Sequence, residues 1–185
     1  AIGDGPLSTA TTIGDVMPER VPAEEPAKAA ITVEHLLTMT SGLAADGEWD
    51  IDELADAGRS WVDGPLLAPL RSEPGAAFAY NNGAAHVLGV LLAVAVGTRL
   101  RTFAEERLFD PLGITDYRWP EDPEGNALAY GHLELRPIDL VRLGELYLHP
   151  GGVIAPEYVT RATTAATAGG PPERTGYGYL WWVTE

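Results

Sequence analysis

The most informative segment of the chain reads Ile31-Thr32-Val33-Glu34-His35-Leu36-Leu37-Thr38-Met39-Thr40-Ser41-Gly42-Leu43. Thr32 stands where an N-cap residue is expected, directly before apolar residues spaced to form one face of a short helix. Ser41-Gly42 is the expected stop. The segment therefore predicts a short helix from Val33 to Met39, with one buried face and a turn behind it.

A long helix is expected further along, from about Ala84 to Val96, with Gly97 closing it. This stretch is apolar on almost every side, which predicts that it forms the buried centre of the domain. A second helix is expected over residues 98–109, ended by Pro111 and Gly113. Shorter helices are expected near residues 13–17, within 50–70, after Arg136 as far as Pro150, and over 156–163.

Strand signals are few. Residues 126–135 alternate loosely, and residues 177–183 form an apolar, aromatic run typical of a strand. About seven helical segments against two short strands predict a mainly helical chain. An apolar strand near residue 183 with no later segment to pair with it leaves backbone groups unsatisfied, so the sequence is interpreted as an incomplete domain.

The composition of the chain argues against several classes of function. The chain has 185 residues, the size of one domain, and its 12 basic against 27 acidic residues give a net charge of -15. Such a charge repels phosphate backbones, so nucleic acid is not an expected partner. The longest apolar run, residues 87–96, is shorter than the roughly 20 residues a membrane span needs. With no cysteine, disulfides and thiolate chemistry are excluded.

Several segments, in order and with matching gaps, resemble the serine β-lactamase-like family, the penicillin-recognising serine hydrolases that include class C β-lactamases, D-alanyl-D-alanine carboxypeptidases and family VIII esterases. The blocks that carry the resemblance are residues 31–43, Glu73-Pro74-Gly75, Phe78, Tyr80-Asn81-Asn82, residues 111–114, residues 131–148 and residues 177–183. The resemblance implies an α/β parent fold of the β-lactamase/transpeptidase-like class. This chain would supply its central portion, a mainly α helical lobe with one or two short strands.

Two motifs of the family are missing from the chain. The only lysine is Lys28, residue 25 is a glutamate, and Ala29 follows the lysine. Neither Ser-x-x-Lys nor Lys-Thr-Gly can therefore be present. Complete members carry the nucleophile serine shortly before the segment that residues 1–5 resemble, and a Lys/His-x-Gly strand after the Trp-Trp segment. The resemblance thus predicts one incomplete domain over residues 1–185, lacking both flanking segments.

The resemblance assigns two catalytic residues to this chain. Tyr80 matches the tyrosine that handles the serine's proton, and Asn82 matches the asparagine that orients the lysine and hydrogen-bonds the substrate amide. A phenol with its ordinary pKa near 10 is ionised only about one part in a thousand at pH 7, so it needs nearby cations to act as a base. The alternative is that Tyr80-Asn81-Asn82-Gly83 is only a turn that caps the long helix.

The remaining polar and aromatic residues favour structural roles. His35 is expected to pack within its helix, Ser41 to stop it, and the His149-Pro150-Gly151 run to follow a helix, unlike the family's His-x-Gly strand. The other histidines are too scattered to suggest a metal site, and no cofactor is expected. An aromatic group is expected to be mostly core, with substrate contact as the alternative: Trp119, Tyr177, Tyr179, Trp181 and Trp182.

These features give three hypotheses. In the first, the chain is the helical lobe of a serine hydrolase that acts through an acyl-enzyme on a small-molecule substrate, a β-lactam, a D-alanyl peptide or a small ester, and is inactive alone. In the second, it is a naturally truncated, non-catalytic binding or interaction module. In the third, it covers an exposed apolar face by self-association, or binds complementing flanking segments.

Overall fold

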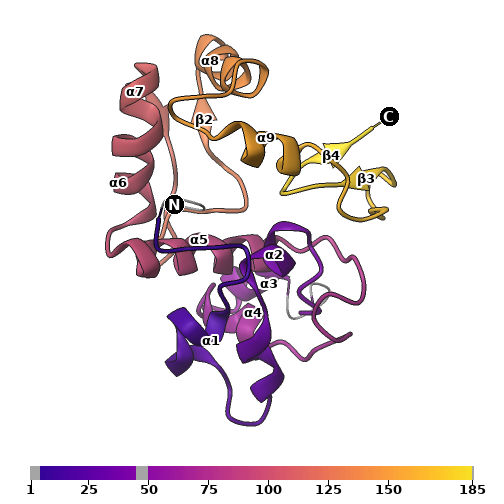
Figure 1. Ribbon diagram of the computed structural model, residues 1–185. Coiled ribbons are helices and arrows are strands. Elements are labelled where there is room, and N and C mark those ends of the chain that lie inside the picture. The colour runs from indigo at the N-terminus through magenta and orange to yellow at the C-terminus, as the bar shows by residue number, and fades with distance from the viewer. Residues whose placement is uncertain (1–4, 45–49, 185) are drawn as a thin grey trace.

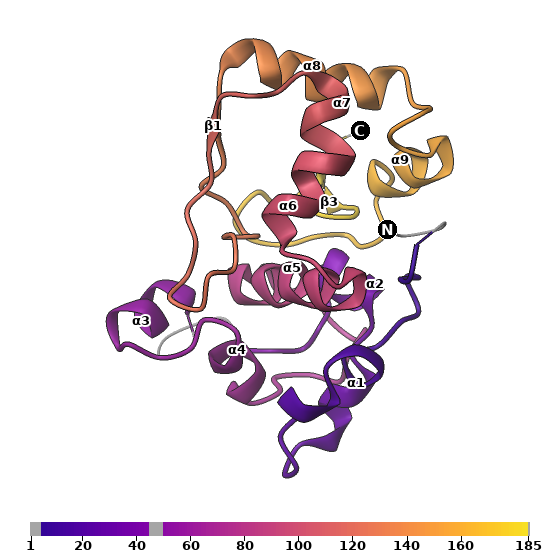
Figure 2. The ribbon, with the colours of Figure 1, turned by 90° about the vertical axis from the view of Figure 1, so that its left-hand side faces the viewer.

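The computed structural model describes residues 5–44 and 50–184, and Figure 1 shows its arrangement. The segment of residues 1–5, which supports part of the resemblance, lies largely outside the described residues. The longest helix, α5 (Asn82–Val96), crosses the middle of the molecule. Elements before α5 lie mostly on one side of it and elements after it lie on the other, as Figures 1 and 2 both show.

The elements before α5 are short. They are α1 (Ile13–Val16), two 3-10 turns (Pro18–Arg20 and Pro26–Ala30), α2 (Val33–Leu37), α3 (Ile51–Asp56) and α4 (Asp63–Leu67). After α5 come α6 (Leu100–Ala104), a π-helical turn (Glu105–Phe109), α7 (Asp110–Leu112), α8 (Pro137–Leu148) and α9 (Pro156–Ala162). The prediction of a mainly helical chain is confirmed.

Two small antiparallel pairs complete the fold. Strand β1 (Tyr117–Arg118) pairs with β2 (Glu134–Leu135), and β3 (Gly176–Tyr177) pairs with β4 (Trp182–Val183). The predicted strand over 126–135 is therefore confirmed only at its last two residues, and its partner β1 was not predicted. The predicted single strand over 177–183 is wrong, because it is a hairpin that turns at Leu180, where φ is 58°. Its apolar residues pair with each other, so the expected unpaired strand does not exist.

The main core lies between α5 and the N-terminal elements. Ala84, Val87 and Leu91 of α5 are fully buried there against α1 and α2. The second half of the helix is less covered, and Val94 is 49% exposed. The prediction of a wholly buried helix is thus right only for its first half. Gly97 ends α5 in the left-handed conformation that a glycine favours, as expected (φ 70°).

Helix α2 begins as the sequence predicts and ends earlier. The Thr32 hydroxyl accepts the His35 amide at 3.1 Å, and His35 Nδ1 accepts the Thr32 amide at 3.2 Å, a reciprocal capping box. The helix stops at Leu37, so the expected extension to Met39 is wrong: Met39 already has a φ of 57°. The chain then turns through Gly42, where a Cβ atom would lie 2.2 Å from the Ser72 carbonyl oxygen.

The helix predicted over 98–109 runs further than expected. The π-helical turn over Glu105–Phe109 interrupts the regular hydrogen-bond ladder, and Pro111 falls in the first turn of α7, where its missing N–H is tolerated. Pro111 therefore does not end the helix. Gly113 does, with a φ of 65°.

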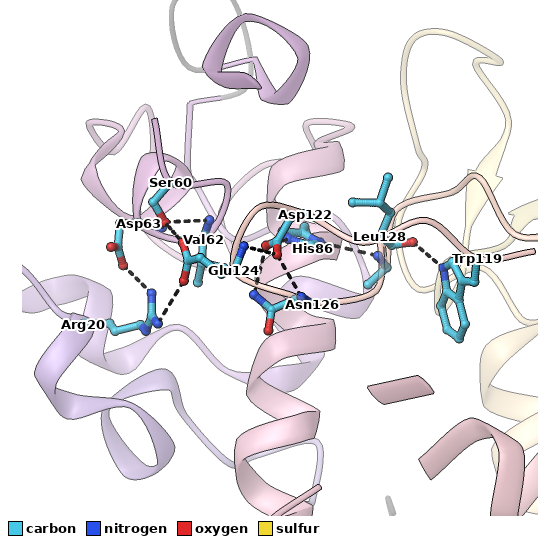
Figure 3. A network of polar contacts seen from close by, with 11 residues as sticks. Arg20, Ser60, Val62, Asp63, His86, Trp119, Asp122, Glu124, Asn126 and Leu128 are labelled. Carbon is cyan, nitrogen blue, oxygen red and sulfur yellow. Dashed lines mark hydrogen bonds and ion pairs between the residues drawn. The ribbon is translucent and has the colours of Figure 1, made fainter. Parts of the chain in front are cut away.

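A buried polar pair connects α5 to the loop before β2, as Figure 3 shows. His86 and the Asp122 side chain are fully buried, and His86 Nε2 donates to Asp122 Oδ2 at 3.1 Å. Asp122 also accepts the amides of Glu124 and Asn126, while the Ala129 amide donates to His86 Nδ1. Because Nδ1 is an acceptor, His86 is neutral with its proton on Nε2. The pair therefore holds the loop on α5.

We expect acid to destabilise the chain through these histidines. Burial lowers the pKa of His86 below its ordinary value of 6.5, and this effect outweighs the hydrogen bond and charge of Asp122, which raise the pKa. Burial also lowers the pKa of His35. Below about pH 6.5 the unfolded chain then binds more protons than the folded chain, so the free energy of unfolding falls as pH falls. Urea unfolding at about pH 7 and pH 5 tests this, with His86→Gln expected to reduce the slope. Equal stability at both pH values would contradict it.

Candidate active site

The two predicted catalytic residues lie at the start of α5. Tyr80 precedes the helix by two residues and is 38% exposed, while Asn82 is the first helical residue and is half-buried. Within the described part of the chain, neither the Tyr80 hydroxyl nor the Asn82 side chain makes a hydrogen bond. Both polar groups are thus available to a partner from outside these residues.

Asn81 has the structural role that the alternative interpretation gave to the whole turn. It is 3% exposed, its Oδ1 accepts the Ala84 amide at 2.9 Å, and its Nδ2 donates to the Leu43 carbonyl at 3.1 Å. Asn81 therefore caps α5 and joins it to the turn after α2. The capping function and the candidate catalytic function fall on different residues of the same motif.

Aromatic rings surround Tyr80. Its ring stacks on Trp182 with centroids 5.6 Å apart and an interplanar angle of 25°, and it meets Tyr177 edge-on at 6.5 Å. Phe78 contacts Tyr177 at 5.2 Å and Trp182 at 5.8 Å. These four rings, here called the Tyr80 cluster, join the Tyr-x-Asn motif to the β3–β4 hairpin. The sequence had not predicted this contact.

The predicted aromatic group does not gather in one place. Tyr177 and Trp182 join the Tyr80 cluster, whereas Tyr179 is in the main core and donates to Glu34 at 2.6 Å. Trp181 makes a tilted ring contact with Tyr147 of α8 and is 42% exposed. Trp119 is half-buried and donates to the Leu128 carbonyl at 2.9 Å. The expectation of a mostly structural group holds for Tyr177, Tyr179 and Trp119.

Neither buried tyrosine of this group suits proton transfer. Burial, and then the neighbouring Tyr80, raise the pKa of Tyr177 above its ordinary value of 10. Burial and the hydrogen bond to Glu34 raise the pKa of Tyr179 to about 12. Both phenols therefore stay protonated near neutral pH. Tyr80, in contrast to these two buried tyrosines, is partly exposed to solvent.

The remaining candidates of the sequence are engaged in local contacts. The Ser41 side chain is buried in the turn after α2, where its Oγ accepts the Leu43 amide at 3.4 Å. Lys28 is 1% exposed and ion-paired with Glu25. His149 follows helix α8, as expected, and contacts Glu145. Among residues 5–44 and 50–184, no group of three or more His, Asp or Glu side chains is placed to hold a metal ion.

The segment 31–43 holds both parts of the candidate site. The Met39 carbonyl accepts the Ala79 amide at 2.8 Å, next to Tyr80, and the Leu37 carbonyl accepts the Leu180 amide at 2.9 Å, in the turn of the hairpin. The Tyr-x-Asn motif and the hairpin are nearly a hundred residues apart in sequence, yet both are tied to the residues around the end of α2. The signature segment is therefore a scaffold: Thr32 and His35 cap its helix, and Glu34 accepts a hydrogen bond from Tyr179 of the hairpin.

An apolar groove of about 420 Å³ lies along the other face of α5. Its walls come from α2, α5, α6, α9 with the segment before it, and the hairpin turn, and they include Leu37, Leu88, Leu92, Phe103, Tyr158 and Leu180. Neither Tyr80 nor Asn82 lines it. The groove is thus a hydrophobic surface next to the candidate site and is separate from its polar groups.

No single helix of the described residues has the length and hydropathy to cross a membrane. Asn82–Val96 and Leu100–Leu112 meet those limits only when taken together, and they are bent by 78° at their junction.

A helical lobe, a capped signature helix, and a Tyr-x-Asn motif at the start of the central helix define the β-lactamase/transpeptidase-like class of folds. The family described as Beta-lactamase matches residues 1–185. The chain therefore belongs to the Beta-lactamase family, which groups β-lactamases with penicillin-binding and esterase-like serine hydrolases.

Named relatives agree with this assignment. The chain is 27% identical over 191 residues to Penicillin-binding protein 4 of Amycolatopsis lactamdurans, covering 89% of this chain and 49% of that protein. It is 30% identical over 140 residues to lovastatin esterase of Penicillium rubens, covering 71% of this chain and 34% of the relative. The chain thus spans about half of the first relative and about a third of the second.

The fold is also found in solved structures. The octameric penicillin-binding protein homologue from Pyrococcus abyssi superimposes with a TM-score of 0.70 at 21% identity, over 95% of this chain and 47% of that one. This confirms that the lobe has the architecture expected from the sequence.

Proposed function

We propose that residues 1–185 form the helical lobe of a serine hydrolase that works through an acyl-enzyme on a β-lactam, a D-alanyl peptide or a small ester. In this proposal Tyr80 handles the proton of a serine, and Asn82 orients a lysine and the substrate amide. The observation that carries it is the pair of polar side chains at the start of α5, inside the family's Tyr-x-Asn motif, that make no hydrogen bond within residues 5–44 and 50–184.

The chemistry proposed for Tyr80 requires nearby cations. A phenol becomes a base near pH 7 only when positive charge favours the phenolate. The only lysine of the chain, Lys28, is buried against Glu25. In this proposal the cations come from the family's Ser-x-x-Lys segment and Lys/His-x-Gly strand. This is why we expect residues 1–185 to be inactive alone.

The same proposal treats residues 1–185 as one incomplete domain. The apolar groove beside α5 supports it, because Leu88, Leu92 and Phe103 line this groove and are only partly buried within the described residues. Covering such a surface contributes roughly 25 cal/mol for each Å² removed from water. Flanking segments of the hydrolase would stabilise the lobe in this way.

The proposal is tested with an extended protein, in which residues 1–185 are joined to a Ser-x-x-Lys segment before them and a Lys/His-x-Gly strand after them. We expect the extended protein to hydrolyse at least one of nitrocefin, a p-nitrophenyl ester and an acylated D-alanyl-D-alanine. Replacing its motif serine by alanine should abolish that turnover. A folded extended protein that hydrolyses none of the three would favour a non-catalytic module.

Self-association is the second candidate, and exposed apolar residues on α8 favour it. Ile138, Val141 and Leu148 are 53%, 57% and 72% exposed on this helix. The homologue from Pyrococcus abyssi is described as octameric. Light scattering that gives the mass of a single chain over a wide concentration range would exclude this second candidate.

A further inference from the structure

The Tyr80 side chain is held by ring contacts alone. Its hydroxyl has no hydrogen-bond partner in the described part of the chain, and its ring contacts there are with Trp182 and Tyr177. A partly exposed tyrosine with a free hydroxyl otherwise moves among rotamers. The direction in which the hydroxyl points is therefore set by these neighbouring rings.

Trp182 makes the face-to-face contact of the two. Its ring lies 25° from the plane of the Tyr80 ring, whereas the Tyr177 ring is nearly perpendicular to it at 81°. An edge contact supports one rim of the phenol, whereas an offset-stacked indole lies against part of one face. Trp182 therefore restricts the plane of the Tyr80 ring more than Tyr177 does.

Trp182 is itself fixed by its surroundings. Strand β4 pairs it directly with Tyr177, whose ring meets the indole at 4.7 Å and 82°, and Phe78 meets the indole at 5.8 Å. The hairpin is anchored twice more, by Leu180 to the Leu37 carbonyl and by Tyr179 to the Ala162 carbonyl. The position of the indole is thus determined by the scaffold, independently of Tyr80.

The neighbouring tryptophan has a different role. Trp181 contacts Tyr147 of α8 at 4.8 Å and donates to its hydroxyl at 3.3 Å. Trp181 lies in the hairpin turn directly before β4, and its indole contacts α8, whereas the indole of Trp182 contacts Tyr80. Trp181 is therefore a matched control for Trp182.

We propose that Trp182 is a positioning residue, whose indole stacks on Tyr80 and sets the direction of the phenol hydroxyl toward the reacting serine. The stacking itself concerns this chain alone. Its catalytic consequence rests on the function proposed for Tyr80. A catalytic group reacts fastest when it is held in the productive orientation. A displacement of about 1 Å can lower the reaction rate roughly a hundredfold.

The stacking is tested by ¹⁹F NMR of the chain labelled with 3-fluorotyrosine. The chain has 7 tyrosines, and the Tyr80 resonance is the one missing from the Y80F spectrum. We expect Trp182→Ala to move and narrow the Tyr80 resonance toward that of free 3-fluorotyrosine, because the ring current and the restraint are lost. Trp182→Phe should keep most of the shift, and Trp181→Ala should leave the Tyr80 resonance in place. An unmoved Tyr80 resonance in folded Trp182→Ala would overturn the proposal.

Activity is measured separately in the extended protein. We expect Trp182→Ala to lower kcat roughly tenfold to a hundredfold with little change in KM, and Trp182→Phe to restore most of it. If Y80F leaves turnover unchanged, the function proposed for Tyr80 fails, whatever the NMR result. If Y80F abolishes turnover but Trp182→Ala keeps full kcat while its Tyr80 resonance is freed, the positioning role fails and the proposed function stands.

Discussion

Replacing Tyr80 by phenylalanine in the extended protein is expected to lower kcat/KM by about 10²–10⁴-fold, the usual contribution of a positioned general base. The substitution removes only the hydroxyl, which makes no hydrogen bond within the described residues, and it keeps the ring that stacks on Trp182. Stability should therefore be almost unchanged. Steady-state kinetics on the best substrate of the panel, with thermal unfolding alongside, give both values.

The matched control for this substitution is Tyr147→Phe. Tyr147 is half-buried on α8, and its hydroxyl accepts a hydrogen bond from Trp181. Its removal tests whether the loss of any tyrosine hydroxyl near the hairpin reduces turnover. We expect full activity in Tyr147→Phe. Equal kcat/KM in Tyr80→Phe and the parent would show that Tyr80 does not transfer the proton.

Replacing Asn81 by alanine should be the most damaging change to stability in the Tyr-x-Asn motif, at about 2–4 kcal/mol. The N-cap of α5 is lost, and the buried carbonyls of Leu43 and Ala44 lose the donor that joins them to the helix. Urea unfolding of the chain followed by circular dichroism measures the difference.

Asn82→Ala provides the contrast at the next position. Asn82 is half-buried and its side chain makes no hydrogen bond in the described residues, so alanine should change stability by less than about 1 kcal/mol. In the extended protein the same variant should lose activity. If Asn82→Ala unfolded the chain as readily as Asn81→Ala, the separation between cap and catalytic residue would be wrong.

Local sequence signals predicted the framework of the lobe well. Thr32 as a cap and Gly97 as a helix stop were predicted correctly because each acts through its own backbone geometry and nearest neighbours. The helix behind the Tyr-x-Asn motif was also expected, although it begins at Asn82 and not near Ala84, and the catalytic roles of Tyr80 and Asn82 stay predictions. Helix caps and helix stops can be predicted from the sequence because they depend on residues that are close together in the chain.

Errors arose where the outcome depended on distant contacts. The single strand expected over 177–183 is a hairpin because Leu180 is tied to Leu37, more than a hundred residues earlier. The pairing of His86 with Asp122 likewise joins a helix to a loop with no pattern in either segment. The stacking of Trp182 on Tyr80 is of the same kind. Single-sequence patterns report periodicity and caps, but they do not report which segments meet.

The most direct test of the account is the intact mass of the purified chain before and after incubation with a fluorophosphonate, which labels activated serines whatever the natural substrate. The chain should stay at its unlabelled mass of 19.7 kDa, while the extended protein gains one label that its serine-to-alanine variant lacks. A labelled 19.7 kDa species would show that a serine within residues 1–185 is activated without Ser-x-x-Lys, and it would contradict the account.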